Sequence, residues 1–167
     1  MQFALVVNGI VYQVYGQDPT GVFHPGMNWI PIPIGLPVQQ GWTYIDGVFA
    51  APPPPPPPTL AQQAATLMAN GLTITSTATP ALNGTYGADD GSTANISAIV
   101  TGLVAGQGFP PTGATTFLYQ ELSGIPHEFG ETDFTNLATA IRNFVYVCKA
   151  VINGGLTDLP ANTATIP

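Results

Sequence analysis

The residues whose types and spacing could do chemistry are concentrated between positions 121 and 133. They are four carboxylates and one histidine: Glu121, His127, Glu128, Glu131 and Asp133. Such a group could hold a metal ion or act as an acid/base pair. One histidine among carboxylates is a thin ligand set, however, and no serine, cysteine or lysine stands in a nucleophile context nearby. The favoured interpretation is a polar hairpin edge that runs into the N-terminus of a helix.

A second acidic stretch, Asp89-Asp90-Gly91-Ser92, comes directly before an apolar-periodic segment. Acidic and hydroxyl side chains at such a place satisfy free amide donors and favour the positive end of the helix dipole. A calcium site would need more oxygen ligands at loop spacing. A catalytic carboxylate pair would need one desolvated carboxyl, and nothing here suggests one. We therefore interpret the stretch as a helix N-cap.

Two other residues with reactive side chains are explained more simply by packing. His24 lies beside Pro25-Gly26 in a loop-like segment with no acidic or cysteine partner nearby. Cys148 is the single cysteine, so one chain can form neither an intrachain disulfide nor a cysteine-based metal cluster. It falls within an apolar helical pattern, which is typical of a small core residue. The sequence thus predicts no catalytic, cofactor-binding or metal-binding residue, no cofactor, and no enzymatic activity.

Charge excludes two classes of partner. The net charge is −7, and the only basic residues are Arg142 and Lys149. About two phosphate contacts at most would give too little counterion release to support nucleic-acid binding, and a polybasic membrane patch fails for the same reason. Charged residues make up 7% of the chain, against about 25% in typical globular proteins. Since hydrophobic residues reach 45%, the chain should be ordered and packed against neighbours.

No segment approaches the run of about 20 apolar residues that a membrane span needs. The first residues also lack the basic region and apolar run of a signal peptide. We therefore expect no membrane span and synthesis in the host cytoplasm.

The chain is organised around seven consecutive prolines at residues 52–58. A proline run cannot donate backbone hydrogen bonds and favours an extended polyproline II rod. At about 3.1 Å per residue, it would hold its flanks roughly 22 Å apart. It could be a passive linker, a ligand for an aromatic groove of another protein, or a stiff arm that packs against a partner. The predicted organisation is α+β: a small β-hairpin module (1–51), a polyproline linker (52–58), a helix/hairpin domain (59–155) and an extended tail (156–167).

Two turn dipeptides predict two hairpins in the first module. Asn8-Gly9 joins residues 3–7 to 10–15, and Asp46-Gly47 joins residues 42–45 to 48–50; such pairs favour type I′ turns because both central positions need φ > 0. A regular register places six side chains on one side as three facing pairs: Val7 with Ile10, Leu5 with Tyr12, and Phe3 with Val14. Alternating prolines make residues 30–34 at most an edge strand.

The second part should contain helices and short strands. Thr59 is a plausible N-cap for a helix at 60–69, which Asn70-Gly71 would close in a left-handed cap. Strands are predicted at 72–75, 85–88, 115–120 and 125–129, with a helix after Ser92 and a break at 106–111. The clearest helix spans about 132–152, with nine apolar residues at helical spacing. The tail should be extended or docked on a partner.

The second part resembles the small C-terminal domain of unknown function found in phage tail and tail-fibre-associated proteins. The resemblance rests on Leu72-Thr-Ile-Thr-Ser-Thr-Ala-Thr-Pro-Ala-Leu-Asn-Gly-Thr-Tyr86, Asp89, Asn95-Ile96, Gly106-Gln-Gly-Phe109, Gly124, His127 and the closing helix. The first part is similar to the β-rich leaders of such proteins, in which a Gly-Trp-x-Tyr-x-Asp-Gly-x-Phe stretch (here residues 41–49) runs into prolines. The resemblance carries over no catalytic residue.

The resemblance implies a virion structural protein of the tail or fibre attachment region, present in several copies or as a homo-oligomer and bound to other virion proteins. Three alternatives stay open: a capsid decoration or head-fibre protein, a fibre-assembly chaperone, and a host-carbohydrate-binding module. The candidate partner-binding residues are Trp29, Trp42, Tyr44, Pro52, Pro55 and Pro58.

Overall fold

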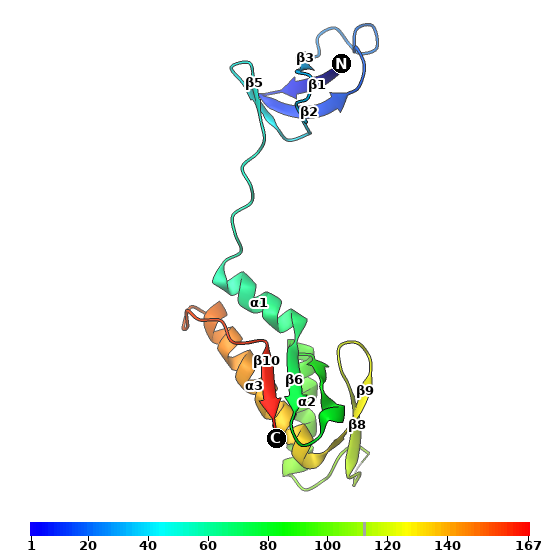
Figure 1. The fold of residues 1–167 in the computed structure, drawn as a ribbon, viewed down its shortest axis with the longest axis vertical. Coiled ribbons are helices and arrows are strands. Elements are labelled where there is room, and N and C mark those ends of the chain that lie inside the picture. The colour runs from blue at the N-terminus through cyan, green and yellow to red at the C-terminus, as the bar shows by residue number, and fades with distance from the viewer. Residues whose placement is uncertain (112) are drawn as a thin grey trace. The chain divides into compact units, whose positions relative to one another are not determined.

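Five short antiparallel strands form the sheet of the N-terminal part in the computed structural model, which describes residues 1–111 and 113–167. The strands are β1 (Gln2–Val7), β2 (Ile10–Tyr15), β3 (Trp29–Ile32), β4 (Thr43–Ile45) and β5 (Val48–Ala50). Their order is β3-β1-β2-β4-β5 (Figure 1). The edge position predicted for the proline-alternating segment is confirmed by β3, which pairs with β1 alone.

Both predicted hairpin turns are confirmed. Asn8 and Gly9 have φ values of 51° and 77°, and Asp46 and Gly47 have 52° and 84°. Positive φ at both central positions is the geometry of a type I′ turn, which matches the twist of the strands that it joins. The first turn connects β1 to β2 and the second connects β4 to β5.

The predicted register of the first hairpin is wrong beyond its first pair. Val7 does pair with Ile10, but a bulge after the Val6–Val11 pair makes Val14 face Ala4. The bulge carries Val14 onto the face that is buried, where Ala4, Val6 and Val11 form the core. The face that carries Val7 and Ile10 is exposed, since these two side chains are each about half accessible. Because both faces of this hairpin are apolar, alternation alone did not distinguish them.

The C-terminal part combines three α-helices with two small sheets. Its elements are α1 (Leu60–Asn70), β6 (Leu72–Ser76), the 3₁₀ turn η1 (Pro80–Leu82), β7 (Gly84–Tyr86), α2 (Asp90–Val104), β8 (Thr116–Gln120), β9 (Pro126–Gly130), α3 (Glu131–Ile152) and β10 (Thr163–Ile166). One sheet has the order β10-β6-β7, and β8 pairs with β9 in a hairpin. The α+β class predicted from the sequence is confirmed.

Local side-chain chemistry starts the first two helices as predicted. Thr59 and Gln62 form a reciprocal capping box at α1, and the Asp89 carboxylate accepts hydrogen bonds from the Ser92 amide (3.0 Å) and hydroxyl (2.7 Å) at α2. The prediction of a left-handed cap after α1 is wrong, because Gly71 has φ +78° but ψ −176°. Its ψ is extended because the chain enters β6 directly.

α3 supplies the centre of the C-terminal core. Seven of its apolar side chains are buried: Phe134, Leu137, Ile141, Phe144, Val145, Cys148 and Val151. Phe134 meets Phe109, Phe117, Tyr119 and Phe129 edge-to-face, with ring centroids 5.4–6.0 Å apart. Phe109, in the segment predicted only as a break, is fully buried in this cluster. Burial of these large side chains is the main source of the stability of this part.

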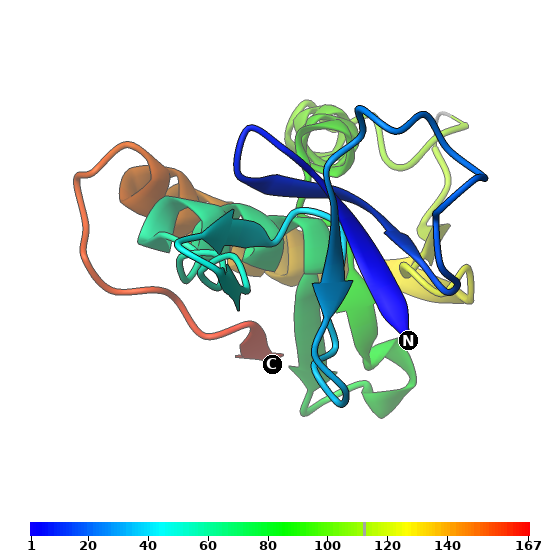
Figure 2. The same ribbon diagram turned by 90° about the horizontal axis from the view of Figure 1, so that it is seen from above.

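Part of the tail predicted at 156–167 is a strand, β10, that packs on its own chain. Residues of β10 pair in parallel with β6, in the register Thr163 with Thr73 through Ile166 with Ser76 (Figures 1 and 2). Ile166 is buried in the C-terminal core. A segment ninety positions from its partner in sequence thus completes the sheet.

The chain divides into two compact units, Met1–Pro56 and Pro57–Pro167. Each has its own hydrophobic cluster, and no residue belongs to both. Residues 51–59 form neither helix nor strand, and their side chains are exposed. None of the helices in the part of the chain that the structure describes combines the length and hydropathy required to cross a bilayer.

Candidate functional site

Of the five ionisable residues between positions 121 and 133, the structure brings only two together. Glu121 Oε2 and His127 Nε2 lie 3.9 Å apart across the β8–β9 hairpin, and both side chains are almost buried. Glu128 is exposed on β9, and Glu131 and Asp133 lie in the first turn of α3. This agrees with a polar hairpin edge that runs into a helix N-terminus.

The hydrogen bonds of this pair fasten the hairpin to the sheet. Glu121 Oε2 accepts a hydrogen bond from the Thr85 amide of β7 (3.0 Å), and the Leu122 amide donates to the Thr85 carbonyl (2.8 Å). His127 Nδ1 lies 2.7 Å from the Ala81 carbonyl, which can only accept, so this nitrogen carries the proton. The cluster therefore closes the outer edge of β7.

The order of the groups does not match a nucleophile relay. The Ser123 hydroxyl donates to Glu121, and the carboxylate stands between the serine and the histidine. Nucleophilic catalysis needs the histidine next to the hydroxyl, with the carboxylate behind it. In its neutral form His127 has no partner for Nε2 among the described residues. The arrangement therefore has a structural role, which is to hold the β8–β9 hairpin against β7.

Hydrogen bonds hold the pKa of Glu121 below its ordinary value of 4.5. The Ser123 hydroxyl has the largest effect, and the Thr85 amide and the nearby His127 ring lower the pKa further, while desolvation opposes them. A carboxyl with a depressed pKa in the folded state adds stability above its ordinary pKa. That stability is lost as the pH falls through the folded-state pKa.

We therefore expect Glu121→Gln to destabilise the C-terminal unit at neutral pH. The variant should also lose less stability than the unaltered protein as the pH falls from neutral to below 4.5, the ordinary pKa of this carboxyl. The measurement is the urea midpoint of the helical circular-dichroism signal across that range. Glu128→Gln, an exposed change on the neighbouring strand, is the control and should retain the acid dependence. Equal pH profiles for Glu121→Gln and the unaltered protein would contradict the role assigned to this carboxylate.

The remaining polar candidates have structural roles. Both carboxylate oxygens of Asp89 are engaged by Ser92, and Asp90 forms an exposed ion pair with Lys149 (2.7 Å). Cys148 is buried in α3, where desolvation raises the pKa of its thiol. Within residues 1–111 and 113–167, no three His, Cys, Asp or Glu side chains are grouped so that they could hold a metal ion.

The three aromatic candidates for partner binding do not form one surface. Trp29 lies on β3 and packs against Phe23, with ring centroids 4.9 Å apart. Trp42 and Tyr44 pack against the N-terminal core near β4, which β1 and β2 separate from β3. Of the three, Trp29 lines a cavity of about 460 Å³, to which Phe23, His24 and Asp18 also contribute.

The proline candidates Pro52, Pro55 and Pro58 are exposed in the segment between the two units. The Pro58 carbonyl accepts a hydrogen bond from the Gln63 side chain (2.9 Å), which ties the end of the run to the start of α1. Their part in partner binding stays a prediction.

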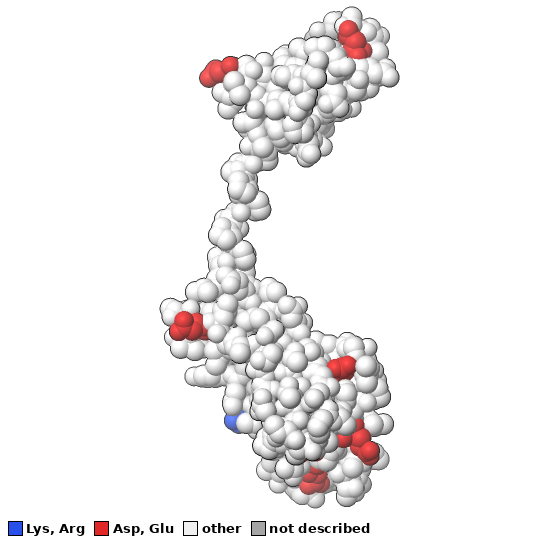
Figure 3. All heavy atoms as spheres, viewed as in Figure 1, with Lys and Arg blue, Asp and Glu red and all other residues white. Residues whose placement is uncertain are grey.

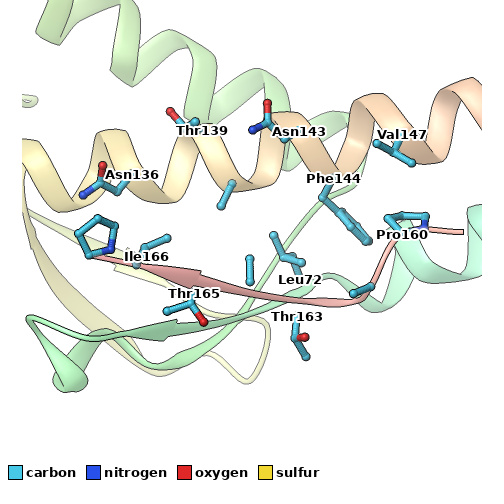
Figure 4. A pocket seen from close by; sticks show the side chains of 14 residues that line it. Leu72, Asn136, Thr139, Asn143, Phe144, Val147, Pro160, Thr163, Thr165 and Ile166 are labelled. Atoms are coloured by element: carbon cyan, nitrogen blue, oxygen red, sulfur yellow. The ribbon is translucent and has the colours of Figure 1, made fainter.

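One open groove in the C-terminal unit involves residues that the sequence analysis did not single out. It measures about 500 Å³ and lies between α3 and β10 (Figure 4). One wall carries Asn136, Thr139 and Asn143 from α3, and the other is β10 itself. The signals were a stripe of small and amide residues along α3 and the alternating Thr-Ala-Thr-Ile of the tail.

Comparison with known proteins adds no relative: no protein-family model matches the chain, and no curated protein matches it significantly.

Proposed function

We propose that this protein is a structural component of a phage virion that links other virion proteins, in the tail or at a fibre attachment. The observation that carries the proposal is the presence of two units with separate cores on either side of an exposed proline run. Two independently packed units can each hold a different partner. The resemblance of residues 72–86 and 41–49 to phage tail-associated proteins supports the same function.

In this proposal, residues 1–51 form a β-hairpin docking module, residues 52–58 a polyproline linker, and the C-terminal helix/hairpin domain a second docking module. Consecutive prolines have no backbone donors and restricted φ angles, so they favour a stiff rod of roughly 22 Å. Such a rod would keep two bound partners at a set separation.

The distribution of charge supports a role in an assembly. Acidic side chains are scattered over the face that Figure 3 shows, and most of that surface carries no charge. Surfaces with few charges are poorly suited to a free monomer in solution and favour packing against other proteins. Partners would be other virion proteins or further copies of this chain, assembled after synthesis in the host cytoplasm.

Mass spectrometry of purified particles tests this function. We expect peptides of this protein in particles that have been banded twice, at a constant ratio to the major tail protein. Immunogold labelling should then place it on the tail rather than on the capsid. Absence from the particles, with the protein present in the infected-cell lysate, would instead indicate an assembly chaperone.

A second candidate function, binding of a host carbohydrate, is favoured by the cavity at Trp29. An aromatic wall next to the Asp18 carboxylate and the His24 imidazole can stack on a sugar ring and bond its hydroxyl groups. The Gly26 amide donates to His24 Nδ1 (3.1 Å), so Nε2 carries the ring proton. A glycan array probed with the full chain and with Trp29→Ala distinguishes this function, which requires a signal that the variant loses.

A further inference from the structure

The edge of β10 carries free backbone groups. The Asn162 carbonyl accepts a hydrogen bond from the Thr73 amide of β6 (2.9 Å), and the Ile166 carbonyl accepts one from the Thr77 amide just after β6 (3.0 Å). In a strand, alternate residues direct their backbone groups to opposite sides. The N–H and C=O groups of Thr163 and Thr165 therefore point away from β6, toward the outer edge, where the described residues place no further strand.

The β3 edge of the N-terminal sheet, in contrast, offers no free donor. The Val6 amide donates to Asn28, so Asn28 and, by alternation, Ile30 face β1. The outward positions are then Trp29, whose amide donates to the Met27 carbonyl (3.1 Å), and Pro31, which has no N–H. This edge is blunted in the way that natural sheets avoid unwanted pairing.

The other two edges of the larger sheets are also limited. On β7, both outward groups of Thr85 are taken by Glu121 and Leu122. On β5, which has three residues, only Phe49 points outward, between a tight turn and the proline run. Of these four edges, only that of β10 has two outward-pointing residues, Thr163 and Thr165, whose backbone groups have no partner among the described residues and which lie beside a groove.

The groove beside β10 lies where a further strand of the sheet would be, and α3 covers it. A stripe of α3 lies over it: Asn136, Thr139, Ala140, Asn143 and Val147. These side chains are half-buried or exposed, so the helix extends beyond the strand that it covers. None of the described residues that line the groove is charged. A charged side chain placed there would lose hydration without a partner.

We propose that this groove binds an extended, uncharged segment of a partner polypeptide, which adds as a fourth strand beside β10. The segment would exchange backbone hydrogen bonds with Thr163 and Thr165 and place alternate side chains against α3. The inference deepens the proposed linking function and rests on it for the partner's identity as a virion protein. The hydrogen-bonding argument holds for any peptide of this chemistry.

Two occupants from this chain itself are disfavoured. Edge-to-edge pairing of β10 with a second copy would put both α3 helices on the same face of the joint sheet. Since α3 already covers the position of the added strand, the two helices would compete for one space. The proline run of a second copy fails because a strand without N–H groups cannot donate to the free carbonyls.

The test begins with selection of random linear heptapeptides from a display library against the full chain. Selected peptides, synthesised with blocked ends, are titrated against the full chain and two groove variants. Thr165→Pro removes one outward donor, and we expect at least about a fivefold loss of affinity, as for one backbone hydrogen bond. Asn143→Asp, which charges the groove, should also weaken binding. Peptide binding should slow hydrogen exchange at the Thr163 and Thr165 amides.

Matched controls separate the groove from general damage. Asn95→Asp makes the same chemical change at an exposed site on α2, and Thr157→Pro places a proline in the exposed tail outside the groove; both should bind as the unaltered chain does. Selection that yields no binder, or binders that Thr165→Pro retains, would overturn the inference. So would a dimer of the free protein that Thr165→Pro dissociates, since the occupant would then be a second copy. None of these three results bears on whether the protein is present in purified particles, so the linking function is tested separately.

Discussion

Replacement of Phe134 by alanine is expected to lower the free energy of unfolding of the C-terminal unit by about 3–5 kcal/mol. Phe134 is fully buried, and its ring lies edge-to-face with four other aromatic rings. Removal of the ring leaves a cavity that these large, interlocked neighbours can fill only in part. The loss should therefore be near the upper end for a single core substitution.

Each unit has its own spectroscopic signal, so one denaturant titration can follow the unfolding of both units separately. Trp29 and Trp42, the only tryptophans, lie in the N-terminal unit, and the three α-helices lie in the C-terminal unit. In Phe134→Ala, the denaturation midpoint from helical circular dichroism should fall, and the midpoint from tryptophan fluorescence should stay unchanged. Tyr146→Ala, an exposed change on the same helix, is the control, with an effect within about 0.5 kcal/mol. If both signals shifted together in Phe134→Ala, the two units would be one cooperative structure.

Replacement of Gly71 by alanine is expected to lower the free energy of unfolding of the C-terminal unit by about 2–5 kcal/mol. Gly71 connects α1 to β6 with φ +78°, a region that side chains disfavour. A Cβ atom there would lie 2.5 Å from the Tyr86 carbonyl oxygen and 2.7 Å from the Leu122 Cδ1 atom. The carbonyl belongs to β7 and cannot move without disturbing its pairing with β6.

Gly154 provides the matched control for this prediction. It follows α3 with φ +75°, and a Cβ atom there would meet nothing within 4 Å. Gly154→Ala therefore carries only the conformational penalty, about 1–2 kcal/mol. The difference between the two variants, measured by urea denaturation of the helical signal, isolates the steric effect. Equal losses would mean that the backbone around Gly71 adjusts freely.

Features set by a few neighbouring residues could be predicted from the sequence. Asn8-Gly9 and Asp46-Gly47 predicted the two hairpin turns because these pairs tolerate the positive φ values that such turns need. Thr59 and Asp89 predicted helix starts because their oxygens reach amides three residues along the same chain. The spacing of apolar residues predicted α3 because one helix face is formed by residues only three or four positions apart.

The contacts within the candidate site and the position of the groove could not be predicted from such short-range patterns. The sequence grouped five ionisable residues between Glu121 and Asp133, whereas the structure joins only Glu121 and His127 and uses them to hold β7. The groove at β10 depends on pairing between residues ninety positions apart, which no local pattern encodes. Asn136, Thr139 and Asn143 had the composition of a solvated helix face until a strand was placed beside them.

The sequence by itself determined the turns, the caps, the α+β composition and the two stretches of different character around the prolines. Tertiary structure decided the β-bulge that carries Val14 to the core, the burial of Phe109 and the docking of the tail on β6. The division has one physical cause. Backbone geometry and capping act over a few residues, whereas which apolar face is buried, and which edge stays open, depends on surfaces that meet only after the chain has folded.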